Sequence, residues 1–325
     1  MSGALPWSSA GARTLVIVNP AAGYGRALRR WPSIARALVA AGVRFDTVVT
    51  DGPGDATAYA RRALRSGFET IVAVGGDGTA NEVVNGFFDG EEPIAPRGRF
   101  GLIPAGSGGD LARTLGLRGD APYRALGPDG RTGVIDLVRV RYTAFDGRPG
   151  MRYFANSGDL GIGGETVAAL RTGTKRLGGF IAYLVAAVRA ILHHRARTLT
   201  YWIDDGPPTS ELVDTIFVTN GRFIGGGMRL APAAVIDDGI LDGLVLRRVS
   251  RIELLLRLLP AIYRGAHLRH PAVKYFRARR IRVEADEPVL LQIDGEQPGM
   301  APAEFEIVPA ALRIALPPAE ATPAR

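Results

Sequence analysis

One stretch of the sequence combines the residue types that phosphate chemistry needs. Residues 71–86 read Ile-Val-Ala-Val-Gly-Gly-Asp-Gly-Thr-Ala-Asn-Glu-Val-Val-Asn-Gly. An apolar, β-branched run ends at Gly75 and Gly76, and a helical pattern opens after Asp77. The inward positions of that helix are Val83, Val84 and Phe87. Glycines let a backbone approach a phosphate closely, and the start of a helix attracts anions. The stretch predicts a phosphate-binding loop, with an unliganded glycine turn as the alternative.

Asp77 is the one carboxylate inside this turn. A carboxylate would repel a bound phosphate unless a cation lay between them. We therefore expect Asp77 either to hold or orient Mg²⁺ or to order the loop through hydrogen bonds.

Composition restricts the class of protein. The 325 residues are 46% apolar and 22% charged, which is typical of a globular chain long enough for two domains. The absence of cysteine excludes disulfides, thiolate metal sites and cysteine nucleophiles. Residues 1–13 lack the apolar core of a signal peptide, and no apolar run has the length of a membrane span. We expect a cytoplasmic protein.

Positive charge is concentrated in the middle of the chain. Residues 139–282 hold 23 Lys or Arg against 11 Asp or Glu, a net charge of +12 within a total of +8. Such a bias suits an anionic membrane surface or a nucleic acid. However, 38 of the 40 basic residues are Arg, and a compositional preference for Arg can also produce basic patches that bind no partner. Since no aromatic stacking platform is evident, we expect no nucleic-acid partner.

Strands alternate with helices in the first part of the chain. The expected strands are 14–19, 44–49, 71–75 and 100–104. We expect Pro32 near the first turn of the first helix and Asp55 as the cap of a helix over 56–65. This rhythm predicts a doubly wound parallel α/β domain with its glycine-bearing turns at the carboxyl ends of the strands.

The rhythm changes near residue 134 to closely spaced strands and turn signals. Expected strands are 134–142, 151–156, 198–203, 213–219, 240–246, 281–284 and 289–293. They predict an antiparallel β-rich second domain, a sandwich or barrel. A helix over 178–194 is either a core helix or the lid of an apolar groove. Because neighbours on a helix do not converge on one ligand, we expect His193 and His194 to be surface or interfacial residues and not a metal pair.

The last strands, 305–308 and 312–316, are expected to return to the first domain. We therefore predict an α/β nucleotide-binding domain over 12–133 with 304–318 returning, and a β-rich lipid-binding domain over 134–303. Residues 1–11 and 319–325 are expected to be tails.

Five motifs occur in a specific order. They are Asn19-Pro20 with its glycine turn, Gly75-Gly76-Asp77-Gly78-Thr79 with Asn81-Glu82, Pro104-Ala105-Gly106-Ser107-Gly108, Asp237-Asp238-Gly239 with Leu241-Asp242-Gly243, and Asp294-Gly295-Glu296. In this order they resemble the diacylglycerol kinase and sphingosine kinase superfamily, most closely its soluble bacterial lipid kinases, over residues 13–317. Gly-Gly-Asp-Gly alone is shared with NAD kinases and phosphofructokinase-like folds.

The resemblance implies ATP- and Mg²⁺-dependent phosphorylation of a lipid hydroxyl, with nucleotide in a cleft between the two domains. Asp77 would act with Mg²⁺ at the phosphates. The implied nucleotide contacts are Asn19, Thr50, Gly76, Asp77, Gly78, Thr79, Ala80, Asn81, Glu82 and Ser107.

The resemblance also places Asp294 and Glu296 near the acceptor hydroxyl. We favour Glu296 as proton acceptor, with Asp294 as its rival; taken alone, Asp-Gly is a hairpin-turn signal. A structural Mg²⁺ site in these enzymes matches Val235, Asp238 and Ile240. Phosphoryl transfer needs mainly positioning and charge neutralisation, which agrees with these roles.

Two positions depart from the family pattern. Gly109 stands where many bacterial members carry Asn, which leaves a diacylglycerol-like and a sphingoid substrate both open. The basic residues of the first phosphate turn are reduced to Arg26.

The predicted function is that of a cytoplasmic lipid kinase working peripherally at the inner, anionic face of the membrane. Its acyl chain would lie between the second domain's sheet and the helix over 178–194. The alternatives are an NAD-kinase-like small-molecule kinase and a lipid- or nucleotide-binding protein without turnover.

Overall fold

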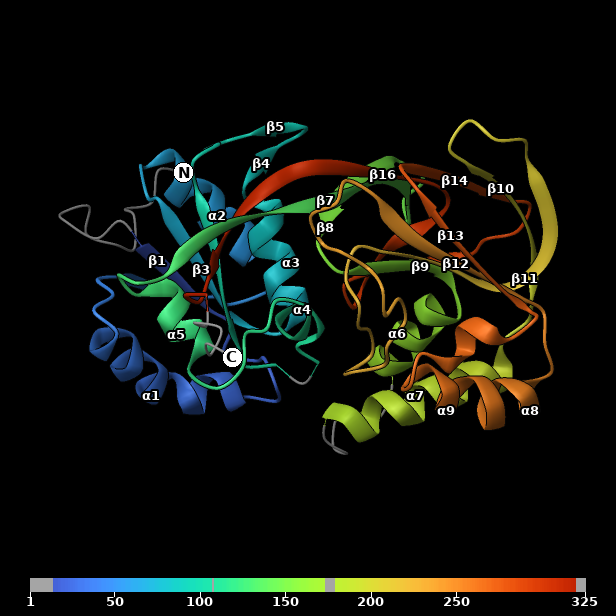
Figure 1. Cartoon of the computed structure of the whole chain (residues 1–325), viewed down its shortest axis with the longest axis horizontal. Helices are drawn as coiled ribbons and strands as arrows, with labels where there is room; N and C mark the ends of the chain where they lie inside the picture. Colours follow the sequence, from blue (N-terminus) through green and yellow to red (C-terminus); the bar gives the residue numbers. More distant parts are fainter. Residues whose placement is uncertain (1–13, 107, 173–178, 320–325) are drawn as a thin grey trace, which may run out of the picture. The chain divides into compact units, whose positions relative to one another are not determined.

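The structure, a computed structural model, describes residues 14–106, 108–172 and 179–319 (Figure 1). It has a mixed α/β fold whose C-terminal part is rich in strands. The chain divides into two compact units. Unit 1 comprises the residues up to Ile135 together with those from Leu312 onward, and unit 2 comprises Asp136–Ala311.

Unit 1 is built on a parallel sheet with the strand order β2-β1-β3-β6-β16. Its strands are β1 (Thr14–Val18), β2 (Asp46–Val49), β3 (Thr70–Gly75), β6 (Arg99–Pro104) and the end of β16 (Glu296–Leu316). Every residue of β3 is buried. A parallel strand buried on both faces reads as a continuous apolar run, which is why residues 71–75 were recognisable as a strand.

The helices of unit 1 form two pairs (Figure 1). One pair is α2 (Asp55–Arg65) with α3 (Asp77–Asn85), and the other is α1 (Arg26–Ala40) with α5 (Ala121–Leu126). The short helix α4 (Asp110–Thr114) contacts β6, and β4 (Phe88–Asp89) and β5 (Glu92–Pro93) form a small hairpin. Val83, Val84 and Phe87 are buried as predicted.

Two local expectations in unit 1 were wrong. Helix α1 already begins at Arg26, so Pro32 lies inside the helix and not in its first turn. Asp55 is the first residue of α2 and does not cap it; its Oδ2 accepts hydrogen bonds from the amides of Asp51 and Gly52, both at 2.8 Å. The carboxylate therefore closes the turn before the helix.

Among the described residues of unit 2, neighbouring strands pair antiparallel. Its strands are β7 (Arg131–Ala144, which begins in unit 1), β8 (Pro149–Phe154), β9 (Ser157–Gly161), β10 (Arg197–Ile203), β11 (Thr209–Thr219), β12 (Leu241–Arg247), β13 (Val273–Ala278), β14 (Arg280–Ala285), β15 (Leu290–Ile293) and β16. The sequence missed β9 and β13. The segments expected as strands 305–308 and 312–316 belong to the single strand β16.

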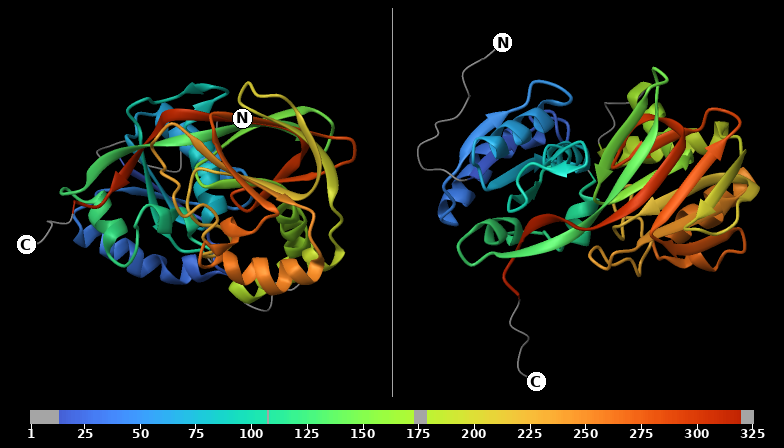
Figure 2. Two further views of the ribbon diagram at one scale, coloured as in Figure 1. Left: turned by 45° about the vertical axis from the view of Figure 1, so that its right-hand side comes forward. Right: turned by 90° about the horizontal axis from the view of Figure 1, so that it is seen from above.

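The strand pairings of unit 2 close a ring that runs from β11 through β10, β14, β16, β15 and β9 back to β11. The large apolar cluster of this unit includes Phe154, Tyr201 and Phe305. Phe154 and Phe305 meet edge to face, with ring centroids 6.2 Å apart. Strands β7 and β8 run beside β16 (Figure 2).

The helices of unit 2 gather on one side of its strands (Figures 1 and 2). They are α6 (Ile162–Thr172), α7 (Gly179–His193), α8 (Arg251–Glu253), the π-helical turn η1 (Leu254–Leu258), α9 (Leu259–Ile262) and the 3₁₀ turn η2 (Ala266–Arg269). Helix α7 falls where a helix over 178–194 was expected, whereas α6 and the segment α8–α9 were not anticipated. Within the described residues, no helix is long and apolar enough to cross a membrane.

Candidate functional site

Three loops of unit 1 leave the sheet at the same edge. They follow β1, β3 and β6, which are parallel neighbours, so their carboxyl ends lie together. Asn19, after β1, donates from Nδ2 to Thr79 Oγ1 at 2.9 Å in the segment after β3. A Cβ added at Gly23 would lie 2.6 Å from the carbonyl oxygen of Ala105, after β6. The three loops therefore contact one another.

The loops after β3 and β6 pack backbone against backbone. The amides of Ala105 and Gly106 both donate to the carbonyl oxygen of Gly75, at 2.8 and 3.0 Å. A Cβ on Gly106 would lie only 2.3 Å from Gly76 Cα. Gly106 is therefore required by the close approach of another backbone.

Asp77 connects the loop after β3 to the start of α4. Its Oδ2 accepts a hydrogen bond from the Gly109 amide at 2.8 Å, and its Oδ1 accepts one from the Leu111 amide at 3.2 Å. Of the two roles expected for Asp77, the ordering of the loop by hydrogen bonds is observed. Each carboxylate oxygen has a second lone pair, so these bonds leave capacity for a cation.

The departure at Gly109 is compatible with the same loop geometry. Gly109 has a φ of 68°, the left-handed region. Besides glycine, Asn is among the residues that adopt this conformation at the lowest cost. Replacing the Asn of the family pattern by Gly therefore leaves this backbone conformation accessible.

Several of the other predicted nucleotide contacts are engaged within the protein. Ala80 and Asn81 are each only 1% exposed, and the Asn81 side chain accepts a hydrogen bond from Asn85. Glu82 Oε2 accepts one from the Ala56 amide at 3.2 Å, at the start of α2. The structure brings Asn19, Gly76, Asp77, Gly78 and Thr79 together at the loop edge, and Thr50 directly follows the neighbouring strand β2. Ser107 lies outside the described residues.

Asp294 and Gly295 form the tight turn that joins β15 to β16. Both have positive φ, 45° and 86°, and Ile293 pairs with Glu296 across the turn. This is the backbone typical of a type I′ hairpin, so the turn signal in Asp-Gly is confirmed.

The two carboxylates of this turn have different surroundings. Asp294 is 5% exposed and accepts hydrogen bonds from the amides of Ala155 and Ser157, at 3.3 and 2.9 Å. Glu296 is partly exposed, and its Oε2 accepts a hydrogen bond from Arg152 at 2.8 Å. Asp294 thus fastens the turn to the backbone around β8 and β9, while Glu296 is held by one guanidinium.

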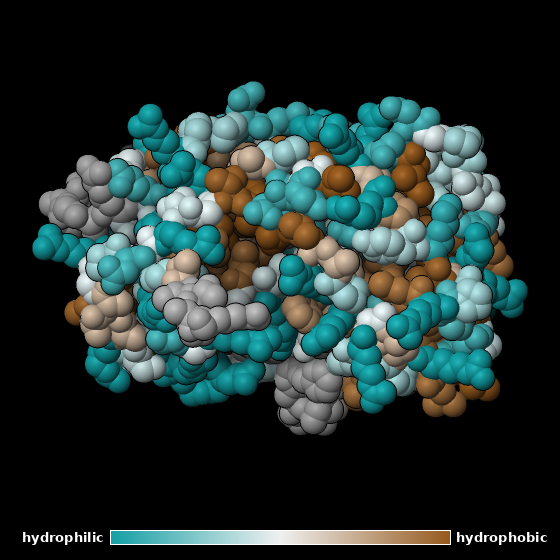
Figure 3. Space-filling model, viewed as in Figure 1, coloured by the Kyte–Doolittle hydropathy of each residue, from teal (hydrophilic) through white to brown (hydrophobic). Residues whose placement is uncertain are grey.

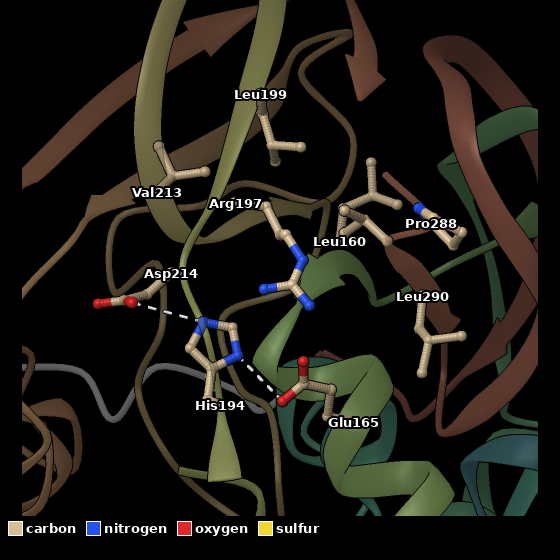
Figure 4. A pocket seen from close by; sticks show the side chains of 11 residues that line it. Leu160, Glu165, His194, Arg197, Leu199, Val213, Asp214, Pro288 and Leu290 are labelled. Atoms are coloured by element: carbon tan, nitrogen blue, oxygen red, sulfur yellow. Dashed lines mark hydrogen bonds and ion pairs between the residues drawn. The ribbon is translucent and has the colours of Figure 1, made fainter. Parts of the chain in front are cut away.

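Unit 2 also contains a cavity of about 220 Å³ between its strands and helices (Figure 4). Its lining includes apolar side chains from β9, β10, β11 and the segment before β15, and a polar group at one end. The apolar lining residues are Leu160, Leu199, Val213, Pro288, Val289 and Leu290. The polar ones are Glu165, His194, Arg197 and Asp214.

The polar end of the cavity is organised by His194, between two carboxylates (Figure 4). Its Nδ1 lies 2.9 Å from Glu165 Oε2, and its Nε2 lies 3.4 Å from Asp214 Oδ1. Burial alone would lower the pKa of His194, but the carboxylates of Asp214 and Glu165 outweigh this and raise the pKa to about 9. His194 is therefore a buried cation at neutral pH, whereas the sequence led us to expect a surface or interfacial residue.

The residues expected to hold a structural metal include one carboxylate, that of Asp238, and this carboxylate already has partners within the protein. Asp238 Oδ1 accepts a hydrogen bond from the Ile240 amide at 3.2 Å, and Oδ2 pairs with the guanidinium of Arg277. Val235 is partly exposed nearby in the chain. The described residues contain no group of three or more His, Asp or Glu placed to bind a metal. Arg277 already neutralises the one carboxylate among Val235, Asp238 and Ile240, so a structural Mg²⁺ site at these residues stays a prediction.

Two family descriptions match this chain. Residues 13–140 match the diacylglycerol kinase catalytic domain, and residues 159–316 match the YegS C-terminal NAD kinase beta sandwich-like domain. A Bacillus subtilis protein named diacylglycerol kinase is 30% identical over 295 residues, covering 90% of this chain and 92% of the relative. The chain belongs to the diacylglycerol kinase family. The resemblance drawn from the five sequence motifs is thereby confirmed.

Other relatives agree with this assignment. A diacylglycerol kinase of Staphylococcus haemolyticus is 32% identical to this kinase over 296 residues, covering 89% of the chain and 84% of the relative. A crystal structure of a diacylglycerol kinase from Bacillus anthracis has a TM-score of 0.66 at 22% identity, covering 94% of this chain and 97% of that one. The latter likeness supports the fold.

Asp159, which is 1% exposed, is among the buried carboxylates of this kinase that sequence reasoning missed. Burial raises the pKa of Asp159 to about 7, against hydrogen bonds from the Gly163 amide and Thr215 that lower it. The Gln292 carboxamide can be oriented so that its nitrogen and its oxygen both have partners. The nitrogen then donates to Asp159 Oδ1 at 2.9 Å, and the oxygen accepts a hydrogen bond from the Gly295 amide at 2.6 Å. Asp159 is thus linked to the Asp294–Glu296 turn, a connection for which the sequence carries no motif.

The glycine contact between the two loops can be tested by Gly106→Ala. The added Cβ must displace the Gly76 backbone, so we expect a loss of about 1–3 kcal/mol in the free energy of unfolding, the usual effect of overpacking. Gly52→Ala is the control, because a Cβ there meets nothing within 4 Å. Chemical denaturation of both variants gives the comparison; equal stabilities would contradict the close contact.

The His194 cluster predicts a pH dependence of stability. Because the folded pKa, about 9, exceeds the ordinary value of 6.5, the charged imidazolium contributes stability fully below pH 6.5, and this is lost as the pH rises through 9. The contribution is on the order of 3 kcal/mol. Denaturation of wild type and His194→Gln at several pH values should show a stability difference that shrinks across this window.

The adjacent exposed histidine provides the control for this experiment. The His193 ring hydrogen-bonds to the backbone carbonyl oxygen of Arg189 and faces no carboxylate among the described residues, so His193→Gln should follow the wild-type curve. A constant difference between His194→Gln and wild type at every pH would show that the cluster does not titrate as described.

Proposed function

We propose that this kinase transfers the terminal phosphate of ATP, with Mg²⁺, to the hydroxyl of a diacylglycerol-like lipid. The observation that carries the proposal is the convergence of the three glycine-bearing loops after β1, β3 and β6. The lipid class is supported by the relatives named diacylglycerol kinase, which align with nine-tenths of the chain.

The phosphate end of ATP is assigned to unit 1. Helix α3 begins at Asp77, and the first N–H groups of a helix have no partner within it and attract anions. Gly76 and Gly78 keep side chains away from this edge, so that a phosphate can approach the backbone. Asn19, Thr79, Thr50 and Ser107 are the proposed polar contacts, and Ala80, Asn81 and Glu82 support the loop from within helix α3.

Asp77 is proposed to act with Mg²⁺ at the phosphates. Its carboxylate is fixed by two backbone amides, so its direction is set before any ligand binds. Mg²⁺, when bound, neutralises charge on the phosphates. A preset carboxylate lowers the cost of ordering the site on binding.

The acceptor end is assigned to unit 2, with Glu296 as the group that takes the proton. The lipid hydroxyl oxygen forms a bond to the terminal phosphorus, the bond from that phosphorus to ADP breaks, and the hydroxyl proton passes to the Glu296 carboxylate. The difference in exposure between the two carboxylates favours this choice. Asp294 is buried and holds the turn, while Glu296 is partly exposed and can reach a substrate.

The acyl chain is proposed to enter the cavity of unit 2, along the side lined by apolar residues. Its lining comes from strands β9, β10 and β11, from α6 and from the residues just after α7, in agreement with the expected groove between sheet and helix. Six apolar side chains suit a hydrocarbon, and the His194 group supplies the polar end.

We place the protein on the cytoplasmic side of the membrane, in peripheral contact with anionic lipid. The positive charge of residues 139–282, which make up most of unit 2, supports this placement.

A kinase assay with labelled ATP and diacylglycerol tests the proposal. Phosphate should appear on the lipid. Asp77→Asn and Glu296→Gln should each lower kcat by about 100-fold or more, as expected for loss of phosphate positioning and of a general base. The measurement is the initial rate at saturating ATP and lipid.

Glu304→Gln is the control for Glu296→Gln. Glu304 lies on the same strand, has a side-chain exposure of 34% against 33% for Glu296, and is likewise paired with an arginine. It should retain wild-type activity. If Asp294→Asn abolishes transfer in a folded protein while Glu296→Gln retains it, the base is Asp294. Phosphorylation of NAD but of no lipid would favour the small-molecule alternative, and ATP binding without any transfer would favour a binding protein.

Occupation of the second metal site is proposed to require release of Asp238 by Arg277. Mg²⁺ should therefore raise the Tm of Arg277→Gln by a few degrees, roughly what binding energies of 1–2 kcal/mol give in a chain of this size. The double variant Arg277→Gln/Asp238→Asn should not respond. The measurement is the Tm of each variant in Mg²⁺ and in EDTA. Equal Tm shifts in the two variants would contradict a metal site at Asp238.

A further inference from the structure

The helical segment Arg251–Ile262, made of α8, η1 and α9, has two apolar faces. Its inner face buries Leu254 and Leu258 against Ile191 of helix α7. On its outer side Ile252 and Leu256 are 70% and 72% exposed, the highest values for large apolar side chains among the described residues. They are four residues apart in the chain and therefore lie about one helical turn from each other. Figure 3 shows apolar side chains protruding over this segment beside hydrophilic ones.

Exposed aliphatic side chains next to cations mark a contact surface. Single exposed apolar residues need no explanation, but neighbouring ones on one helix face reduce solubility unless something covers them. Leu192, at the end of the packed helix α7, is a third such residue, at 45% exposure. The three residues come from two helices that contact each other.

The charges around this apolar face have one dominant sign. Arg248, Arg251, Arg257 and Arg264 are exposed. The only acidic residue in the interval 248–264 is Glu253, which lies 3.1 Å from His270 and 4.0 Å from Arg257. Within the described part of the chain, the guanidinium groups of Arg248 and Arg264 have no ion-pair partner.

This charge pattern argues for an anionic partner and against a second copy of the chain. Two copies meeting on this face would place arginine against arginine, which costs free energy. An anionic bilayer supplies the opposite charge and also a hydrocarbon layer for the aliphatic side chains. Interfacial helices combine these features: they lie in the plane of the membrane with one apolar face inserted and basic residues at the lipid headgroups.

The face also lies next to the cavity of unit 2. Arg251 Nη2 donates to the carbonyl oxygen of His194 at 3.4 Å, and His194 lines the cavity. Leu192 precedes it by two residues. A lipid leaving the bilayer at this face would therefore meet the wall of the proposed acyl site.

From these observations we propose that the outer face of Arg251–Ile262, with Leu192, is the surface that docks on an anionic lipid bilayer. The inference names the membrane partner of the proposed lipid kinase and rests on that function only for its biological purpose. Ile252 and Leu256 insert into the acyl boundary, and Arg248, Arg257 and Arg264 bind lipid headgroups.

The test is co-sedimentation of the full chain with vesicles of phosphatidylcholine, with and without phosphatidylglycerol. Wild type should bind the anionic vesicles, and added salt should weaken the binding. The double variant Ile252→Ser/Leu256→Ser should bind at least tenfold more weakly. The triple variant Arg248→Gln/Arg257→Gln/Arg264→Gln should lose the salt dependence as well as most of the affinity. All five side chains are exposed, so both variants should fold, which thermal unfolding verifies.

Val39→Ser is the matched control. Val39 is 66% exposed on α1, in unit 1. The proposal is overturned if Val39→Ser weakens vesicle binding as much as the double variant, or if binding is independent of phosphatidylglycerol. It is also overturned if wild type is a dimer by light scattering and Ile252→Ser/Leu256→Ser is a monomer, since a second copy would then cover the face.

A second readout separates this inference from the proposed function. On a short-chain diacylglycerol dispersed as monomers, the docking variants should keep wild-type kcat, because no bilayer has to be reached. Absence of activity in wild type would contradict the lipid kinase, while vesicle binding would still decide the docking surface. Loss of activity in the docking variants on the monomeric lipid would overturn the docking role.

Discussion

The backbone contact between Gly76 and Gly106 is the constraint on which the arrangement of the loops after β1, β3 and β6 depends. Neighbouring strands in a sheet are only about 4.8 Å apart, so two loops that leave β3 and β6 together have no room for side chains between them. Once the glycines are in contact, Asp77 lies where it can accept hydrogen bonds from the start of α4. Asn19 then ties the third loop to Thr79. The positions of two helix starts thus follow from the missing Cβ of Gly106.

The elements of this edge were predictable because their signals are local. The run before Gly75 is apolar and β-branched, since β3 is buried on both faces, and the glycines follow directly in the chain. The partners of Asp77 were not predictable. Gly109 and Leu111 lie 32 and 34 residues away, and no spacing rule links a carboxylate to amides at that distance. For that reason the sequence left two roles open for Asp77, and the hydrogen bonds could be seen only in three dimensions.

Unit 2 was harder to predict because tertiary contacts override its local signals. Ser157–Gly161 carries two glycines in five residues, a turn-like composition, yet it is the buried strand β9 between β11 and β15. Gly161 is needed there because a Cβ would lie 2.5 Å from the carbonyl oxygen of Asp214. Likewise His193 and His194 look alike in sequence. Only the second faces two carboxylates, which come from α6 and β11.

The net charge of residues 139–282 indicated that unit 2 is basic, but it could not show which of the arginines are unpaired. Many of the arginines that give residues 139–282 their charge are paired: Arg139 with Glu306, Arg152 with Glu296 and Arg280 with Asp205. A paired guanidinium contributes little to the field at a distance, because the partner carboxylate cancels it. Arg248 and Arg264, which flank the segment that carries Ile252 and Leu256, have no ion-pair partner among the described residues. Unpaired charge and exposed apolar area therefore occur together within residues 248–264, a local combination that a composition summed over 144 residues cannot resolve.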